Sequence, residues 1–168
     1  MSRQNLAEPW LRGTLTEVHP VIRAVLHALE LAKEDLWKWC YPLTLAQLNQ
    51  ASPGVAPVSF HLRHIGRSLD RLLSYAEGSQ LNHRQLWALR TEREPATSHA
   101  RLFRELSEAL HRSRARLVAF ETVDLAAARS VGKKKLPTTV GGLVVHAADH
   151  TQRHVGQAIT TAKMVASP

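Results

Sequence analysis

The sequence predicts an all-α protein, a four-helix bundle with a long crossover-type connection. Apolar residues recur at alternating steps of three and four over several long stretches, the pattern of helices with one buried face. No run of strict apolar–polar alternation is bounded by hairpin signals, so we expect no sheet. The chain has 168 residues, of which 44% are hydrophobic, and we expect a single domain over residues 1–168.

A continuous apolar seam that ends at Trp39 marks the first helix. Pro20 interrupts this seam. Because proline removes a helical hydrogen bond and restricts the residue before it, we expect a kink or the helix start near His19 and Pro20. Residues 41–57 contain three prolines and are predicted to form the long connection, with one short turn at 45–48. The seam consists of Leu11, Leu15, Val18, Ile22, Val25, Leu29, Ala32, Leu36 and Trp39.

The second helix is predicted over residues 57–75, again with apolar residues at steps of four and three, and Gly78 is a plausible stop. A short helical piece follows over residues 82–90. The third helix is predicted to begin at Thr97 or Ser98 as N-cap and to reach Phe120.

The last predicted helix follows a glycine- and lysine-marked segment, SVGKKKLP, at residues 130–137. We predict a loop for this segment because glycine and proline punctuate it. Thr138 or Thr139 is expected to cap the final helix, which extends to about Val165. The four long helices bury their apolar stripes most simply in one bundle.

The excess of positively charged residues favours either binding to anionic partners or solubility alone. Lys and Arg outnumber Asp and Glu by 22 to 14, giving a net charge of +8. Nucleic acid is nevertheless the least favoured alternative, because no helix-turn-helix, zinc-finger or aromatic-interleaved basic pattern is visible. The basic residues considered for it are Arg101, Arg104, Arg112, Arg114, Arg116 and Lys133, Lys134 and Lys135.

No apolar stretch approaches the ~18 residues of a membrane span, and the N-terminal stretch MSRQNLAEPWLRG lacks the apolar core of a signal peptide. We therefore expect a cytoplasmic location and no membrane partner. Cys40 is the sole cysteine of the sequence, which excludes an intramolecular disulfide and any zinc site built from several cysteines of one chain. A metal ion would have to be held by histidines and carboxylates.

Histidine spacing is the main functional signal. Three of the 10 histidines, His146, His150 and His154, are spaced by four. Residues four apart share a helix face, so His150 and His154 can bind one ion at ~2.0 to 2.1 Å. On a helical wheel His154 lies nearest the apolar stripe and His146 furthest, which leaves His146 as an alternate ligand, a neighbour of the ligands or a surface residue. Taken alone, such a pair is more often a set of ordinary core or solvent-edge histidines.

The second helix offers a third imidazole in the segment SFHLRHIGRSLDRLL, where His61 and His64 are three apart. Three imidazoles from two helices would leave one position open on a tetrahedral ion, as in catalytic sites. The helical wheel places His61 nearer the apolar stripe than His64. Residue spacing therefore leaves both open as ligands.

The two segments FHLRHIGRSLDRLL and HAADHTQRHVGQ together resemble the DinB superfamily, metal-binding four-helix bundles that include the YfiT-like proteins. The resemblance implies that His64, His150 and His154 are the metal ligands, with His61 as the alternate on the second helix. Gly156 and Gln157 complete the signature. The arginine that usually precedes this glycine is Val155 here.

Proteins that resemble this one include thiol-dependent S-transferases, a maleylpyruvate isomerase that uses low-molecular-weight thiols, and proteins described as metal-dependent hydrolases. Imidazole ligands suit a divalent Zn or Ni ion. The open three-histidine site, together with the resemblance, predicts an enzyme that activates a small thiol or water for attack on an electrophile, in detoxification or stress response. A small-molecule substrate and a homodimer are also expected. The alternative is a bundle that binds metal or a small molecule without turnover.

The sequence assigns no catalytic acid or base. Asp149, Asp70 and the pair Glu30 and Glu34 have the positions of surface charges, and Cys40 that of a small packing residue. Gln157 is predicted either to contact a ligand or to hold a helix end. A di-iron carboxylate bundle is excluded because the final helix contains no glutamate.

Overall fold

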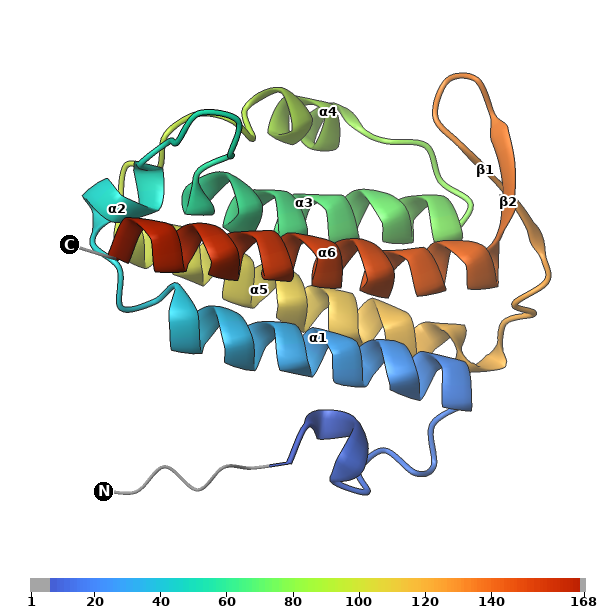
Figure 1. The fold of residues 1–168 in the computed structure, drawn as a ribbon. Coiled ribbons are helices and arrows are strands. Elements are labelled where there is room, and N and C mark those ends of the chain that lie inside the picture. The colour runs from blue at the N-terminus through green and yellow to red at the C-terminus, as the bar shows by residue number, and fades with distance from the viewer. Residues whose placement is uncertain (1–6, 167–168) are drawn as a thin grey trace.

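Four long helices pack side by side in the computed structural model, which describes residues 7–166 (Figure 1). The all-α bundle is confirmed: α3 packs against α5 and α6, and α1 packs against the same two helices from the other side. Residues 1–6, part of the stretch considered as a signal peptide, lie outside the described residues. The long helices are α1 (Pro20–Trp39), α3 (Val58–Ala76), α5 (His99–Val118) and α6 (Val140–Ala166), and the shorter ones are η1 (Pro9–Leu11), α2 (Leu45–Asn49), α4 (His83–Arg90) and η2 (Ala119–Thr122).

Pro20 starts α1 and does not kink it. The N-cap is His19, whose ring accepts a hydrogen bond from the amide of Val21, and Pro20 occupies the first turn, where its missing N–H costs nothing. The first residues of the predicted apolar seam therefore lie before the start of α1. Leu11 belongs to η1, and Leu15 has a positive φ of 58°, which no helix accommodates.

The short elements of the connections follow their capping residues. The predicted turn at 45–48 is α2, capped by a reciprocal pair of hydrogen bonds between Thr44 and Gln47. Asn82 and Gln85 form the same arrangement at the start of α4. Ser98 is the N-cap of α5, as expected, because its hydroxyl accepts from the amide of Arg101.

The expectation of no sheet was wrong at one place. Residues 130–137, predicted as a loop, belong to an antiparallel hairpin of β1 (Ala128–Val131) and β2 (Leu136–Thr139). The hairpin turn carries positive φ at Gly132 and Lys135. Each strand has four residues, none of them buried, so no apolar alternation marks them in the sequence. The next element is as expected, since the Thr139 hydroxyl accepts from the amide of Gly142 at the start of α6.

The core lies between the four long helices, and α3 and α5 approach closely within it. A Cβ on Gly66 of α3 would lie 2.9 Å from the Cβ of Ala109 on α5, so the absence of a side chain at Gly66 permits this spacing. Within residues 7–166, no helix is both long and apolar enough to cross a membrane. Fully buried residues of the core include Ile22, Leu36, Leu62, Leu69, Leu106 and Val144.

Candidate metal centre

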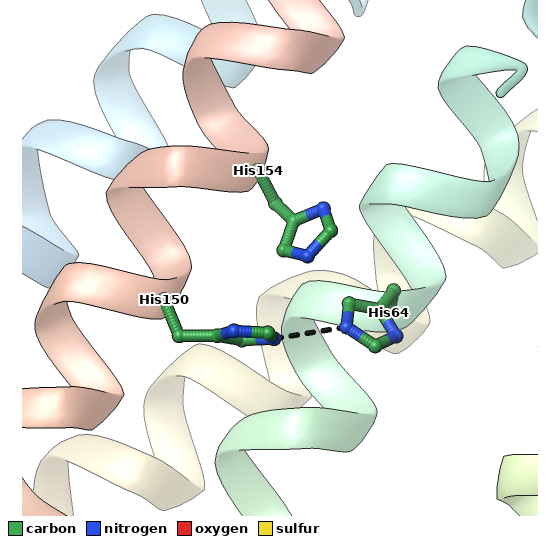
Figure 2. A group of neighbouring side chains, drawn as sticks. All are labelled: His64, His150 and His154. Carbon is green, nitrogen blue, oxygen red and sulfur yellow. Dashed lines mark hydrogen bonds between the residues drawn. The ribbon is translucent and has the colours of Figure 1, made fainter. Parts of the chain in front are cut away.

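Three imidazoles from two neighbouring helices converge between α3 and α6 (Figure 2). His64 comes from α3, and His150 and His154 lie one turn apart on α6. The ring centroid of His64 lies 5.0 Å from that of His150 and 4.4 Å from that of His154, and the two α6 rings are 4.7 Å apart. One ring nitrogen from each residue lies within 4.8 Å of the other two, and all three residues are half-buried.

The spacing of these nitrogens fits an ion bound by imidazoles. Two nitrogens ~2.0 to 2.1 Å from a tetrahedral ion are about 3.3 Å apart. The Nε2 atoms of His64 and His150 are 2.9 Å apart, which is close to that separation. Neutral imidazoles suit Zn, Ni, Cu and Fe, and the residues therefore fit a divalent transition metal without selecting one.

The protein environment keeps two of these rings in the neutral form that binds metal. Burial, followed by the neighbouring imidazoles, lowers the pKa of His150 to about 4 and that of His154 to about 4. A ligating imidazole must be unprotonated, so protons do not compete for these two side chains at neutral pH.

The two alternate histidines lie on either side of the cluster. His61 is buried, as its position near the apolar stripe predicted, and its Nδ1 lies 3.0 Å from Nδ1 of His154. His146 is exposed, and its Nδ1 lies 3.8 Å from a carboxylate oxygen of Asp149. Neither residue belongs to the group whose ligand atoms lie within 4.8 Å of one another among the described residues.

Comparison with protein families agrees with this geometry. The DinB superfamily matches residues 28–158, a range that includes α3 and all three converging histidines. The chain belongs to the DinB superfamily. No curated protein matches the sequence of this DinB protein.

Sequence reasoning missed a buried carboxylate beside the cluster in this DinB protein. Glu92 follows α4, is 4% exposed, and its Oε2 lies 2.7 Å from Nδ1 of His64. Its other oxygen accepts a hydrogen bond from Arg71 of α3. Burial acts to raise the pKa of Glu92, but hydrogen bonds from His64 and Arg71 outweigh it and lower that pKa. No spacing rule joins residues on different elements. The segment RTEREP, in which Arg90 and Arg93 lie near Glu92 in the sequence, is a signal that an ion pair could be sought.

Three arginines on α3 fasten the segment that carries Glu92. Arg63 donates to the carbonyl of Glu94, and Arg67 donates to the carbonyl of Ala88 at 2.8 Å, so the backbone is held on both sides of the carboxylate. Arg71 then binds the carboxylate itself. The three arginines are four apart and share one side of α3, which places them along the connection from α4 to α5.

The other candidate groups of the DinB protein lie outside the cluster. Asp149 forms a surface ion pair with Arg153, and Asp70 pairs with Arg116. Gln157 is exposed on α6, so its two predicted roles stay predictions. Cys40 is fully buried, and burial raises the pKa of its thiol to about 12. Glu30 and Glu34 both bind Arg12, in keeping with their expected role as surface charges.

Proposed function

We propose that this DinB superfamily protein is a metal-dependent enzyme of the thiol transferase or hydrolase type, which holds one divalent ion through His64, His150 and His154. The observation that carries the proposal is the convergence of these three imidazoles from α3 and α6. Among the residues described, no carboxylate or thiol lies within 4.8 Å of the ligand atoms of all three histidines, since Glu92 contacts His64 alone among the three. Three protein ligands leave a coordination position for an exchangeable ligand, as catalytic sites require.

A divalent ion, Zn or Ni, would supply a Lewis acid that makes a small thiol or water nucleophilic near neutral pH. The chain supplies the binding and the surroundings. The Phe60 ring lies 5.2 Å from that of His64 and nearly parallel to it, so it shields one side of the imidazole from water. Cys40 is buried with a raised pKa, so in the thiol reaction the attacking sulfur would belong to a low-molecular-weight substrate.

The proposal includes the finer expectations from the sequence. An electrophilic small molecule attacked by a thiol or water fits a role in detoxification or stress response. We also propose a cytoplasmic location and a homodimer. The competing proposal is a bundle that binds a metal ion or small molecule without turnover, and it rests on the same three imidazoles.

Metal content tests the ligand set. Protein purified without a histidine tag and incubated with Zn²⁺ or Ni²⁺ is expected to retain about one ion per chain after gel filtration. The His150→Ala/His154→Ala double variant and the His64→Ala variant are expected to lose it. His146→Ala is the matched control, since His146 is exposed and lies outside the group of three. Retention of the ion by the double variant would refute the assignment.

Turnover separates the enzyme from the binding bundle. The metal-loaded protein is assayed with 1-chloro-2,4-dinitrobenzene plus a small thiol, and with a nitrophenyl ester in water. We expect acceleration of one reaction that requires the ion and is lost in the double variant. If the wild type binds the ion but accelerates neither reaction over that variant, binding without turnover is the better description.

A further inference from the structure

We propose that Glu92, held by Arg71, is a positioning residue that presets His64 as a ligand through Nε2. The inference rests on the proposed function for its consequence, metal affinity, but its structural content concerns the metal-free protein. It assigns a role to a buried ion pair that lies outside the group of three histidines.

Hydrogen-bond chemistry decides which nitrogen of His64 carries the proton. An ionised carboxylate can only accept, so at the 2.7 Å contact Nδ1 of His64 is the donor and Oε2 of Glu92 the acceptor. A neutral imidazole carries one N–H. In the neutral form of His64 the lone pair therefore lies on Nε2, the atom that is 2.9 Å from Nε2 of His150. In this arrangement Nε2–H of His150 donates to His64 while the site holds no ion.

The surroundings give the carboxylate little freedom to leave this position. The side chain of Glu92 is 5% exposed, and Arg71 occupies the oxygen that does not contact His64. Burying an unpaired carboxylate costs free energy. The ion pair with Arg71 therefore holds the Glu92 carboxylate in the position where it accepts the hydrogen bond from His64. Arg63 and Arg67 hold the backbone on both sides of Glu92.

His154 makes a similar contact with a neighbouring ring. Nδ1 of His154 lies 3.0 Å from Nδ1 of His61. When Nδ1 of a neutral His61 is the acceptor in this contact, Nδ1–H of His154 is the donor. The remaining nitrogen of His154 then presents a lone pair. Figure 2 shows one nitrogen of the His154 ring directed toward the other two rings.

An ion pair with a structural role alone would hold the connection after α4 against α3 but would not change the tautomer of His64. The tautomer of His64 distinguishes the two roles. Long-range ¹H–¹⁵N NMR of the metal-free protein at neutral pH is expected to show the Nδ1–H tautomer for His64. In Glu92→Gln, the neutral amide can donate as well as accept, so the population is expected to shift toward Nε2–H.

Metal affinity is the second measurement, by competition of Zn²⁺ with a chromogenic chelator. Loss of such an outer hydrogen-bond partner typically costs about 10- to 100-fold in affinity, and we expect a loss of that size in Glu92→Gln. Glu92→Asp keeps the charge and is expected to keep the Nδ1–H tautomer with a smaller loss. Glu105→Gln is the matched control, because Glu105 also accepts from an α3 arginine, Arg67, at 2.9 Å, but is only half-buried. It is expected to change neither measurement.

A wild-type His64 in the Nε2–H form overturns the inference, as does a Glu92→Gln variant with unchanged tautomer and affinity. If Glu92→Gln does not fold, the wild-type tautomer and the Glu92→Asp variant decide. If the wild type binds no metal, the proposed function fails, while the tautomer in the metal-free protein still tests the positioning role.

Discussion

Nε2 of His64 lies 2.9 Å from Nε2 of His150, although the two residues are 86 positions apart in the chain. The contact exists because α3 and α6 pack side by side, and the intervening residues form α4, α5 and the hairpin. The geometry of the candidate metal centre therefore depends on helix spacing across the bundle.

Gly66→Ala is expected to destabilise the protein. The added methyl group would lie 2.9 Å from the Cβ of Ala109, so α3 and α5 would have to separate, and overpacking of this kind costs about 1–3 kcal/mol. Chemical denaturation measures the change in the free energy of unfolding. Gly156→Ala is the control on α6, because no atom lies within 4 Å of the new Cβ. It is expected to stabilise by up to about 1 kcal/mol through helix propensity. Equal midpoints for Gly66→Ala and the wild type would contradict the close approach.

The metal-free protein is expected to lose stability as the pH falls from about 6.5 to about 4. Burial, together with neighbouring imidazoles, lowers the pKa of His61, His150 and His154 from 6.5 to about 4 in the folded protein. The unfolded chain binds more protons in this window, so acid favours unfolding, and the loss is complete only below the folded pKa. Urea denaturation at several pH values measures it. A His150→Gln/His154→Gln variant should show a shallower decline; an identical decline would contradict the attribution to these rings.

Cys40 is expected to be unreactive in the native protein. It is fully buried, and the raised pKa of its thiol, about 12, leaves almost no thiolate at neutral pH. Ellman's reagent should label less than about a tenth of the thiol in the folded protein, and all of it in guanidinium chloride. Cys40→Ala should retain the metal ion. Rapid labelling of the native protein would show that the site around Cys40 opens.

The helices could be predicted because their signals are local. The steps of three and four in the apolar seam, the N-cap at Ser98 and the proline at residue 20 each act within a few residues. The hairpin could not be predicted, because its four-residue strands bury no side chain and so carry no alternation. Leu15 belonged to the seam by spacing, yet its backbone is left-handed.

Sequence spacing relates only those residues of the candidate site that lie on the same helix. The spacing of His150 and His154 was readable because both lie on α6, but the choice between His61 and His64 depends on how α3 meets α6. The helical wheel correctly found His61 more buried, whereas the converging group contains His64, at the edge of the apolar stripe. Glu92 reaches His64 from 28 residues away through the path of the chain after α4, which no periodicity encodes.

The placement of the three histidines on α3 and α6 has a thermodynamic consequence. An ion bound to both helices would act as a non-covalent cross-link in the native state and would have no equivalent site in the unfolded chain. Its binding free energy would then add to the folding equilibrium, so the melting temperature would rise with free metal concentration. Cellular metal supply would in that way regulate the lifetime of the folded protein.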